Sequence, residues 1–410
     1  MINTLWLWMF LVAVIYAIFQ FLWGSNIEIF SSIVSSIFSN AQTAVEISIG
    51  LIGILCFWLG FLKIIEETGI AQKISIKLSP LFKVLMKDIP DNSPAISSVV
   101  LNMTANILGL DNAATPVGLK AMEQLQAYNN KKDEASDAQI LFMVINASSI
   151  TLIPITIFMY RAQMGAIQPT DVFIPILLAT TVSTFVGFLS VAIKQKINFK
   201  NAILLKCIFS FVMFISFICV SFSLIPPQKR ILISANIGNA VLILLIGLVL
   251  FIAFKKKIKS YEIFIEGAKE GFGVAIKIIP YLVSMLVVVG VLRASGVLDA
   301  LMIGIKNICI VLNMDSSFVD ALPTAFMKPL SGSGARAMMI ETMKTFGPDS
   351  FPAFVSSVIQ GSTETTFYVL TVYFGSINIS KTRYALKYAL WSDFAGIVAA
   401  ILFSYMFYAN

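Results

Sequence analysis

The chain has 410 residues, of which 58% are hydrophobic and only 12% are charged, with a formal net charge of +7 at pH 7. A soluble domain usually carries about 25% charged residues, so this composition excludes an ordinary soluble protein. The chain has no histidine and its four cysteines stand singly in apolar stretches, which excludes histidine-based catalytic triads and gives no signature of a zinc site or other cofactor.

Several apolar runs are long enough to cross a membrane as helices. Residues 5–22, 203–225 and 231–254 carry almost no charge over about 20 residues, enough to cross a ~30 Å hydrocarbon core. The first run lacks the basic start of a signal peptide and is longer than the apolar part of one, so we interpret it as a first transmembrane helix. Further crossings are expected at residues 46–62, 138–160, 172–194, 275–293, 350–375 and 385–408.

The basic residues gather between the apolar runs. If the amino terminus faces the cytoplasm, most of the 29 lysine and arginine residues fall in cytoplasmic segments, as the positive-inside rule requires. This pattern explains the net charge without a nucleic-acid partner. It predicts a multi-pass membrane protein with a cytoplasmic amino terminus. The amphipathic stretch 70–86, which contains three lysines, is expected to lie along the membrane interface.

Two apolar stretches are interrupted and do not fit simple crossings. Residues 99–125 are broken by a Gly/Asn/Pro-containing run at 109–116, and residues 318–346 by a Pro/Gly/Ser-rich run at 328–334. Each stretch is expected to form a re-entrant helical hairpin, since neither arm is long enough to span.

The order of these elements repeats over residues 46–194 and 275–408, and an odd number of crossings between equivalent points inverts the second copy. The sequence thus predicts an all-α integral membrane protein with inverted repeats, re-entrant hairpins and broken transmembrane helices, a plan typical of secondary transporters. The expected division is 1–200 for the first repeat, 201–260 for two linker helices with a basic loop, and 261–410 for the second repeat.

Polar residues at the breaks are the candidates for ligand contact, because irregular backbone inside a membrane is tolerated only where it is buried in protein or lines a cavity. In the first repeat they are Asn106, Asp111, Asn112, Thr115, Asn146, Ser148, Ser149 and Thr151. Asparagine and threonine side chains can hydrogen-bond hydroxyl or amide groups of a ligand. They also serve as hairpin caps and as interhelical contacts, and the sequence leaves both roles open.

The second repeat offers charges as well. Its polar residues are Lys328, Ser331, Ser333, Arg336, Gln360, Ser362, Thr363, Glu364 and Thr365. The two cations and the glycine-containing turn favour an anion. Glu364 is the strongest candidate, because a carboxylate at membrane depth is costly unless it is paired or hydrated. A structural ion pair with Lys328 or Arg336 is the alternative, and Asp393 either lines the cavity or sits at the interface.

The longest motifs resemble a known family. Residues 106–122 resemble the signature of spore maturation protein A, and residues 328–333, 347–350 and 360–370 that of spore maturation protein B. Both belong to the nucleoside recognition, or Gate, group, which is similar to concentrative nucleoside transporters and to part of the ferrous iron transporter B membrane domain. Members are associated with spore core dehydration and cortex maturation.

The resemblance implies a transporter-like core in which hairpin tips and broken helices contact the ligand. It points to Asn112, Thr115, Ser148, Thr151, Ser331, Ser333 and Ser362 to Thr365. The chain has no close match to the transporters' own substrate-binding motif, so a nucleoside-like ligand is implied only as one option. The resemblance is also compatible with a homo-oligomer.

The sequence therefore predicts a non-enzymatic transporter that moves a small polar or anionic solute across the bilayer by alternating access. Coupling to Na⁺ or H⁺ stays open, with Glu364 or Asp111 as the ion-linked group. One alternative is a non-transporting scaffold or regulator of spore or envelope maturation, in which side chains alone fill the polar breaks. Another is an intramembrane enzyme acting on a lipid-linked precursor, which the absence of histidine and of a clear metal cluster disfavours.

Overall fold

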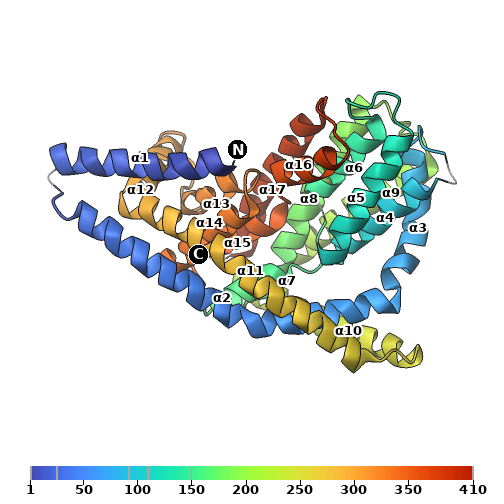
Figure 1. The fold of residues 1–410 in the computed structure, drawn as a ribbon, viewed down its shortest axis with the longest axis horizontal. Coiled ribbons are helices and arrows are strands. Elements are labelled where there is room, and N and C mark those ends of the chain that lie inside the picture. Colours follow the sequence, from blue (N-terminus) through green and yellow to red (C-terminus); the bar gives the residue numbers. More distant parts are fainter. Residues whose placement is uncertain (1, 25, 91–92, 109–110, 149, 409–410) are drawn as a thin grey trace. The chain divides into compact units, whose positions relative to one another are not determined.

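The computed structural model describes residues 2–24, 26–90, 93–108, 111–148 and 150–408, without the side chains of residues 2 and 111–113. The described residues form helices and no β-strand (Figure 1). An isolated bridge between Glu134 and Lys381 joins two loops. This architecture confirms the predicted all-α class.

The helices follow the apolar runs of the sequence closely. Their bounds are α1 (Ile2–Trp23), α2 (Ile29–Thr68), α3 (Ile70–Leu85), α4 (Pro94–Ile107), α5 (Asp111–Ala127), α6 (Asp137–Ser148), α7 (Ile155–Gln163), α8 (Phe173–Lys194), α9 (Ala202–Ser223), α10 (Pro227–Lys255), α11 (Ser260–Ala294), α12 (Val297–Val311), η1 (Val319–Ala321), α13 (Leu322–Met327), α14 (Gly332–Phe346), α15 (Phe351–Ser362), α16 (Thr366–Ser376) and α17 (Ala385–Phe407).

Within the described residues, seven helices are long and apolar enough to cross a membrane: α1, α2, α8, α9, α10, α11 and α17. The chain is thus a multi-pass membrane protein. Two of these helices exceed the predicted spans, since α2 has 40 residues and α11 has 35. At 1.5 Å per residue each is longer than the ~30 Å core of a bilayer.

The two remaining predicted crossings are broken helices. The span expected at 138–160 consists of α6 and α7, with non-helical backbone at residues 150–154, and the span expected at 350–375 consists of α15 and α16, separated by residues 363–365. These four segments have 9 to 12 residues each, so none of them spans a bilayer alone.

Both interrupted stretches form helical hairpins, with breaks shorter than predicted. In the first, α4 ends at Ile107 and α5 begins at Asp111, so Pro116 lies inside α5 and does not belong to the break. In the second, α13 ends at Met327 and α14 begins at Gly332. The arms have 6 to 17 residues, too few for a crossing.

The contacts divide the chain into two compact units, each made of several chain segments. Unit 1 comprises residues 1–61, 157–169 and 262–360, and unit 2 comprises residues 62–156, 170–261 and 361–410. Each unit therefore contains segments from both predicted repeats. The broken helices α6–α7 and α15–α16 each contribute one part to each unit.

Unit 2 is a bundle in which the first hairpin packs with helices from both ends of the chain. The hairpin arms α4 and α5 pack on each other, α3 covers α4, and α16 lies against α5 and α6. The helix α17 packs along α8 and also touches α6 (Figure 1). The core of this bundle is apolar and includes buried Phe142, Met122 and Phe374.

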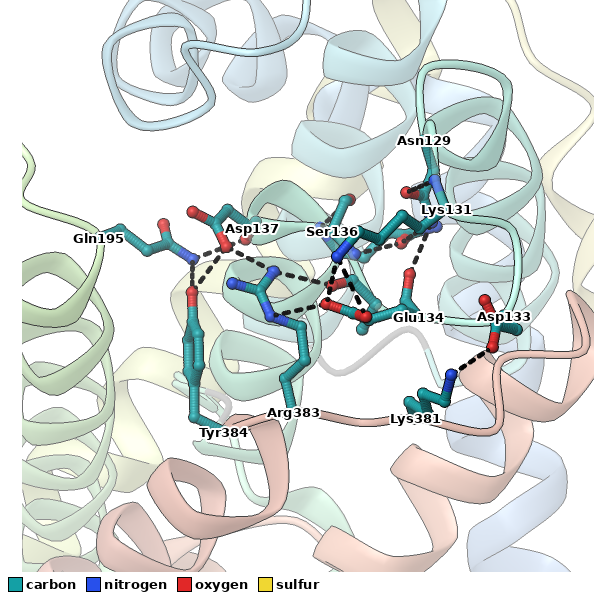
Figure 2. A network of polar contacts seen from close by, with 12 residues as sticks. Asn129, Lys131, Asp133, Glu134, Ser136, Asp137, Gln195, Lys381, Arg383 and Tyr384 are labelled. Atoms are coloured by element: carbon teal, nitrogen blue, oxygen red, sulfur yellow. Dashed lines mark hydrogen bonds and ion pairs between the residues drawn. The ribbon is translucent and has the colours of Figure 1, made fainter.

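Polar contacts join the loop between α5 and α6 to the loop between α16 and α17 at one end of unit 2 (Figure 2). Lys381 Nζ lies 2.8 Å from Asp133 Oδ2, and the hydrogen bond that it donates lowers the pKa of that carboxyl. Arg383 Nη1 lies 2.8 Å from Asp137 Oδ1, which also accepts a hydrogen bond of 2.8 Å from the Tyr384 hydroxyl. These contacts fix the start of α17 relative to the start of α6.

The Tyr384 hydroxyl makes the stability of this loop pair sensitive to alkaline pH. Burial and the hydrogen bond to Asp137 raise the pKa of Tyr384 from 10.0 to about 12. Because the folded state holds the proton more tightly, the stabilisation is complete below the unfolded pKa and is lost as pH rises through the folded pKa. We expect wild-type stability to fall between pH ~10 and ~12 more steeply than that of Tyr384→Phe, measured by thermal unfolding in detergent. The adjacent Tyr388→Phe is the control, and parallel curves for all three proteins would contradict the expectation.

Unit 1 contains the second hairpin together with the long helices α1, α2 and α11. Arg293 of α11 pairs with Glu341 of α14, with Nε 2.9 Å from Oε1. Lys344 Nζ of α14 donates a hydrogen bond to Asn40 Oδ1 of α2 at 3.2 Å. The second hairpin is thus anchored by its longer arm to both long helices.

Candidate functional site

A cavity of about 340 Å³ lies inside unit 2 at the break between α15 and α16. It is lined by Asn106, Ala114, Thr115, Asn146, Glu364, Tyr368, Val369, Val372 and Tyr373. We call it the Glu364 cavity. Its walls come from both arms of the first hairpin, from α6 and from α16, so it combines residues more than 200 positions apart.

A hydrogen-bonded group of asparagines and one tyrosine forms part of the wall. Asn106 Nδ2 donates to Asn146 Oδ1 at 2.8 Å, and Tyr373 Oη donates to the same oxygen at 3.3 Å. Asn102 Nδ2 contacts Tyr373 Oη at 3.3 Å and donates to the carbonyl of Ala114 at 2.7 Å. A Cβ at Gly118 would collide with the Tyr373 hydroxyl, so the small residue gives this group its room.

Glu364 is placed by the backbone of the break. Its N–H donates to the carbonyl of Ala147 at 2.8 Å, which ties the break between α15 and α16 to the end of α6. The flanking residues Thr363 and Thr365 are buried, whereas the Glu364 side chain is exposed within the described structure. Among the residues that line this cavity, Glu364 alone carries a charge.

The structure brings together four of the predicted candidates, namely Asn106, Thr115, Asn146 and Glu364. Ser148 is buried but bonds locally, donating to the Ile145 carbonyl at 3.1 Å. Thr151 lies in the non-helical segment between α6 and α7. Asn112 belongs to α5, but its side chain lies outside the described residues, as does that of Asp111, and Ser149 lies wholly outside them.

The remaining predicted residues lie around the second break and hairpin. Ser362, Thr363 and Thr365 are buried beside Glu364 without lining its cavity, and Asp393 is buried in α17. Lys328, Ser331, Ser333, Arg336 and Gln360 belong to unit 1. An ion pair from Glu364 to Lys328 or Arg336 would join residues of different units and stays a prediction.

The cations of the second hairpin have their own surroundings in unit 1. Ser331 caps α14 by accepting a hydrogen bond from the Gly334 N–H at 3.1 Å, and its hydroxyl lies 3.2 Å from that of Ser333. The guanidinium of Arg336 lies 5.3 Å from the ring centroid of Tyr160. The helix cap and the cation–π contact are structural roles, and serine and arginine can play them as well as they can contact a ligand.

Sequence reasoning missed several residues of these sites. Asn102 and Tyr373 complete the polar group beside Glu364, and Arg161 is fully buried in unit 1. Two signals could have found the asparagine and the arginine. Asn102 and Asn106 lie one helical turn apart, and an arginine that ends an apolar stretch is a functional or structural candidate by its cost in the membrane.

Comparison with known proteins places this architecture in a family. Residues 48–166 and 275–380 both match the model of the family described as nucleoside recognition (Gate), and together they make up more than half of the chain. The chain belongs to the nucleoside recognition family. The two matched segments lie within the two stretches in which the sequence predicts a repeat, while inversion of the second copy stays a prediction.

Two curated relatives each match part of this Gate protein. It is 37% identical over 183 residues to spore maturation protein A of Bacillus subtilis (strain 168), covering 45% of this chain and 90% of that protein. It is 44% identical over 160 residues to spore maturation protein B of the same organism, covering 39% of this chain and 88% of that protein. These matches confirm the resemblance to both spore maturation proteins. No solved structure matches the chain.

Proposed function

We propose that this Gate protein is a transporter that binds a small polar solute in the Glu364 cavity and moves it across the bacterial cytoplasmic membrane by alternating access. The observation that carries the proposal is the cavity itself. A carboxylate, two amides and a tyrosine hydroxyl line an open space beside a break in a membrane helix. Polar groups at this depth are expected to serve a ligand or an ion pathway.

The lining favours a neutral or cationic solute that is rich in hydrogen-bond donors. Glu364 accepts hydrogen bonds and attracts positive charge, while no cation lines this cavity. The exposed ring of Tyr368 offers a face on which a planar group can stack. A nucleoside meets these requirements. The anionic alternative depends on Lys328 and Arg336, which lie in unit 1.

Helices that are broken at the binding site suit alternating access, because their halves can move separately around a fixed ligand. Coupling to Na⁺ or H⁺ through Glu364 is part of the proposal. The open space at the break supports transport over a pure scaffold, for which side chains would fill the break. The orientation with a cytoplasmic amino terminus is likewise proposed, from the distribution of lysine and arginine.

Thermal stabilisation of the purified protein tests the proposal. The panel contains nucleosides, nucleobases, amino acids and dicarboxylates, each in Na⁺ and in K⁺, because a ligand of the folded state raises the unfolding temperature by mass action. We expect at least one donor-rich solute to stabilise the wild type. Glu364→Gln should weaken its binding by about ten- to a hundredfold, since a hydrogen bond to a charged group contributes about 1.5–3 kcal/mol.

The matched control is Glu123→Gln, which removes an exposed carboxylate on α5 outside the cavity and should leave binding unchanged. A hit would be followed by flux into liposomes. If no solute stabilises the wild type, or if Glu364→Gln binds as tightly as the wild type, the proposed site is wrong. A solute that binds without flux would favour the scaffold or regulator.

A further inference from the structure

A second cavity in unit 2, of about 210 Å³, is lined almost entirely by apolar atoms. Its walls come from α3, α4, α6, α8 and α9, and include Leu81, Phe82, Phe185, Phe188, Cys207 and Phe211. We call it the Cys207 cavity. The helices α8 and α9 are both long and apolar enough to span a membrane.

The two cavities share a wall. Asn106 lines both of them, and its side chain donates to Asn146 on the Glu364 side. The next residue along α4, Ile107, and the residue before Asn146, Ile145, line the Cys207 cavity. A single hydrogen bond of 2.8 Å between two side-chain amides therefore lies where the polar cavity gives way to the apolar one.

We propose that the two cavities form one bipartite site and that the solute is amphipathic. Its donor-rich polar head occupies the Glu364 cavity, and its hydrocarbon tail lies in the Cys207 cavity. This inference rests on the proposed function and adds an apolar tail to the polar solute proposed there. The Asn106–Asn146 pair positions the junction between head and tail, since its amides meet the head and the flanking isoleucines meet the tail.

Composition on the two sides of the junction supports one two-part ligand. The polar cavity carries a carboxylate, hydroxyls and amides, whereas the apolar cavity has aromatic and aliphatic walls with Asn106 and Thr184 as its polar residues. Hydrophobic burial of a chain contributes binding free energy in proportion to its apolar area. A purely polar solute would leave this second cavity unused.

Photolabelling of the full chain in lipid nanodiscs tests the inference. The probe is a photoactivatable sphingosine, whose head carries an ammonium and two hydroxyls and whose tail carries a diazirine. The comparison probe is a fatty acid with a diazirine in its tail and a carboxylate head, which Glu364 repels. We expect the sphingosine to label residues of α8 and α9 that line the Cys207 cavity, and the fatty acid to label them far less.

Substitutions at three positions separate binding of the tail from binding of the head. Cys207→Trp fills the apolar cavity, and Cys207→Phe is a smaller substitute if the tryptophan impairs folding. Cys219→Trp places the same side chain elsewhere on α9, outside the cavity. In Glu364→Gln labelling should drop by at least about tenfold, the change expected from losing a hydrogen bond to a charged group. In Cys207→Trp it should drop because the indole occupies the space of the tail, and in Cys219→Trp it should stay unchanged.

Equal labelling by both probes, unaffected by Glu364→Gln, would mean that bilayer lipid alone enters the cavity and would overturn the inference. Absence of labelling at α8 and α9 would overturn it as well. Failure of this inference can be distinguished from failure of the proposed function. A polar solute that stabilises the wild type and depends on Glu364 leaves that proposal standing even if the tail site is never labelled.

Discussion

Arg161→Ala is expected to lower the stability of the protein by about 1–3 kcal/mol, because it leaves buried hydrogen-bond acceptors without their donor. The Arg161 side chain has no exposed surface. Its Nη1 donates to the Pro348 carbonyl at 3.2 Å and to Ser357 Oγ at 3.3 Å, and its Nη2 lies 3.9 Å from Asp349 Oδ1. Removing the guanidinium leaves these acceptors without their donor inside unit 1.

Thermal or denaturant unfolding in detergent measures this effect. Lys229→Ala removes the same charge from an exposed position on α10 and should change stability little. Arg161→Lys keeps the charge but loses the planar donor geometry, so it should fall between the wild type and the alanine variant. An alanine variant as stable as Lys229→Ala would show that the buried arginine contributes nothing to the fold.

Gly271→Val is the second substitution expected to have a large effect. A Cβ at Gly271 would lie 2.7 Å from the Leu55 carbonyl oxygen and 2.8 Å from Cys56 Cα, so it meets backbone atoms of α2 that cannot rotate away. Gly60 makes the reciprocal approach, since a Cβ there would lie 2.7 Å from the Phe264 carbonyl oxygen of α11. With Gly267 one turn earlier, α11 presents the small-xxx-small spacing of close-packed membrane helices.

Overpacking of a well-packed contact costs about 1–3 kcal/mol and more where backbone must move. We therefore expect Gly271→Val to reduce the unfolding temperature and the yield of folded protein. Gly273→Val, on the same helix, is the matched control, because a Cβ at Gly273 would meet no atom within 4 Å. If both variants unfolded at the same temperature, the contact between α2 and α11 would be looser than it is in the structure, and the prediction would be wrong.

Hydropathy predicted most of the fold. Five of the long apolar runs became helices with nearly the expected bounds, because a continuous apolar stretch in lipid must satisfy its own backbone hydrogen bonds, whereas α2 and α11 extend well beyond their predicted spans. Pro116 misled the prediction of the first break. A proline near the start of a membrane helix removes one backbone hydrogen bond and does not end the helix, so α5 runs through it.

The site was predictable only in part. Glu364 was identifiable because charge is rare inside apolar helices, and Asn146 and Thr115 because they flank breaks. Their meeting in one cavity depends on packing between segments more than 200 residues apart, which no local pattern encodes. Tyr373 was missed for the same reason, since a tyrosine in an apolar helix gives no sign of which partner its hydroxyl finds.

Unit 2 combines segments from the first half of the chain with residues 361–410, and this has a consequence for biosynthesis. The chain enters the membrane amino terminus first, so α4, α5 and α6 are inserted well before residues 361–410 exist. Until then the amides of Asn102 and Asn146 keep their hydrogen bonds to Ala114 and Asn106 but lack the Tyr373 hydroxyl. Unit 2 is therefore completed only once residues 361–410 have been made. A truncation that removes α16 and α17 leaves the hairpin of α4 and α5 without α16, which packs against α5, and so exposes it to membrane quality control.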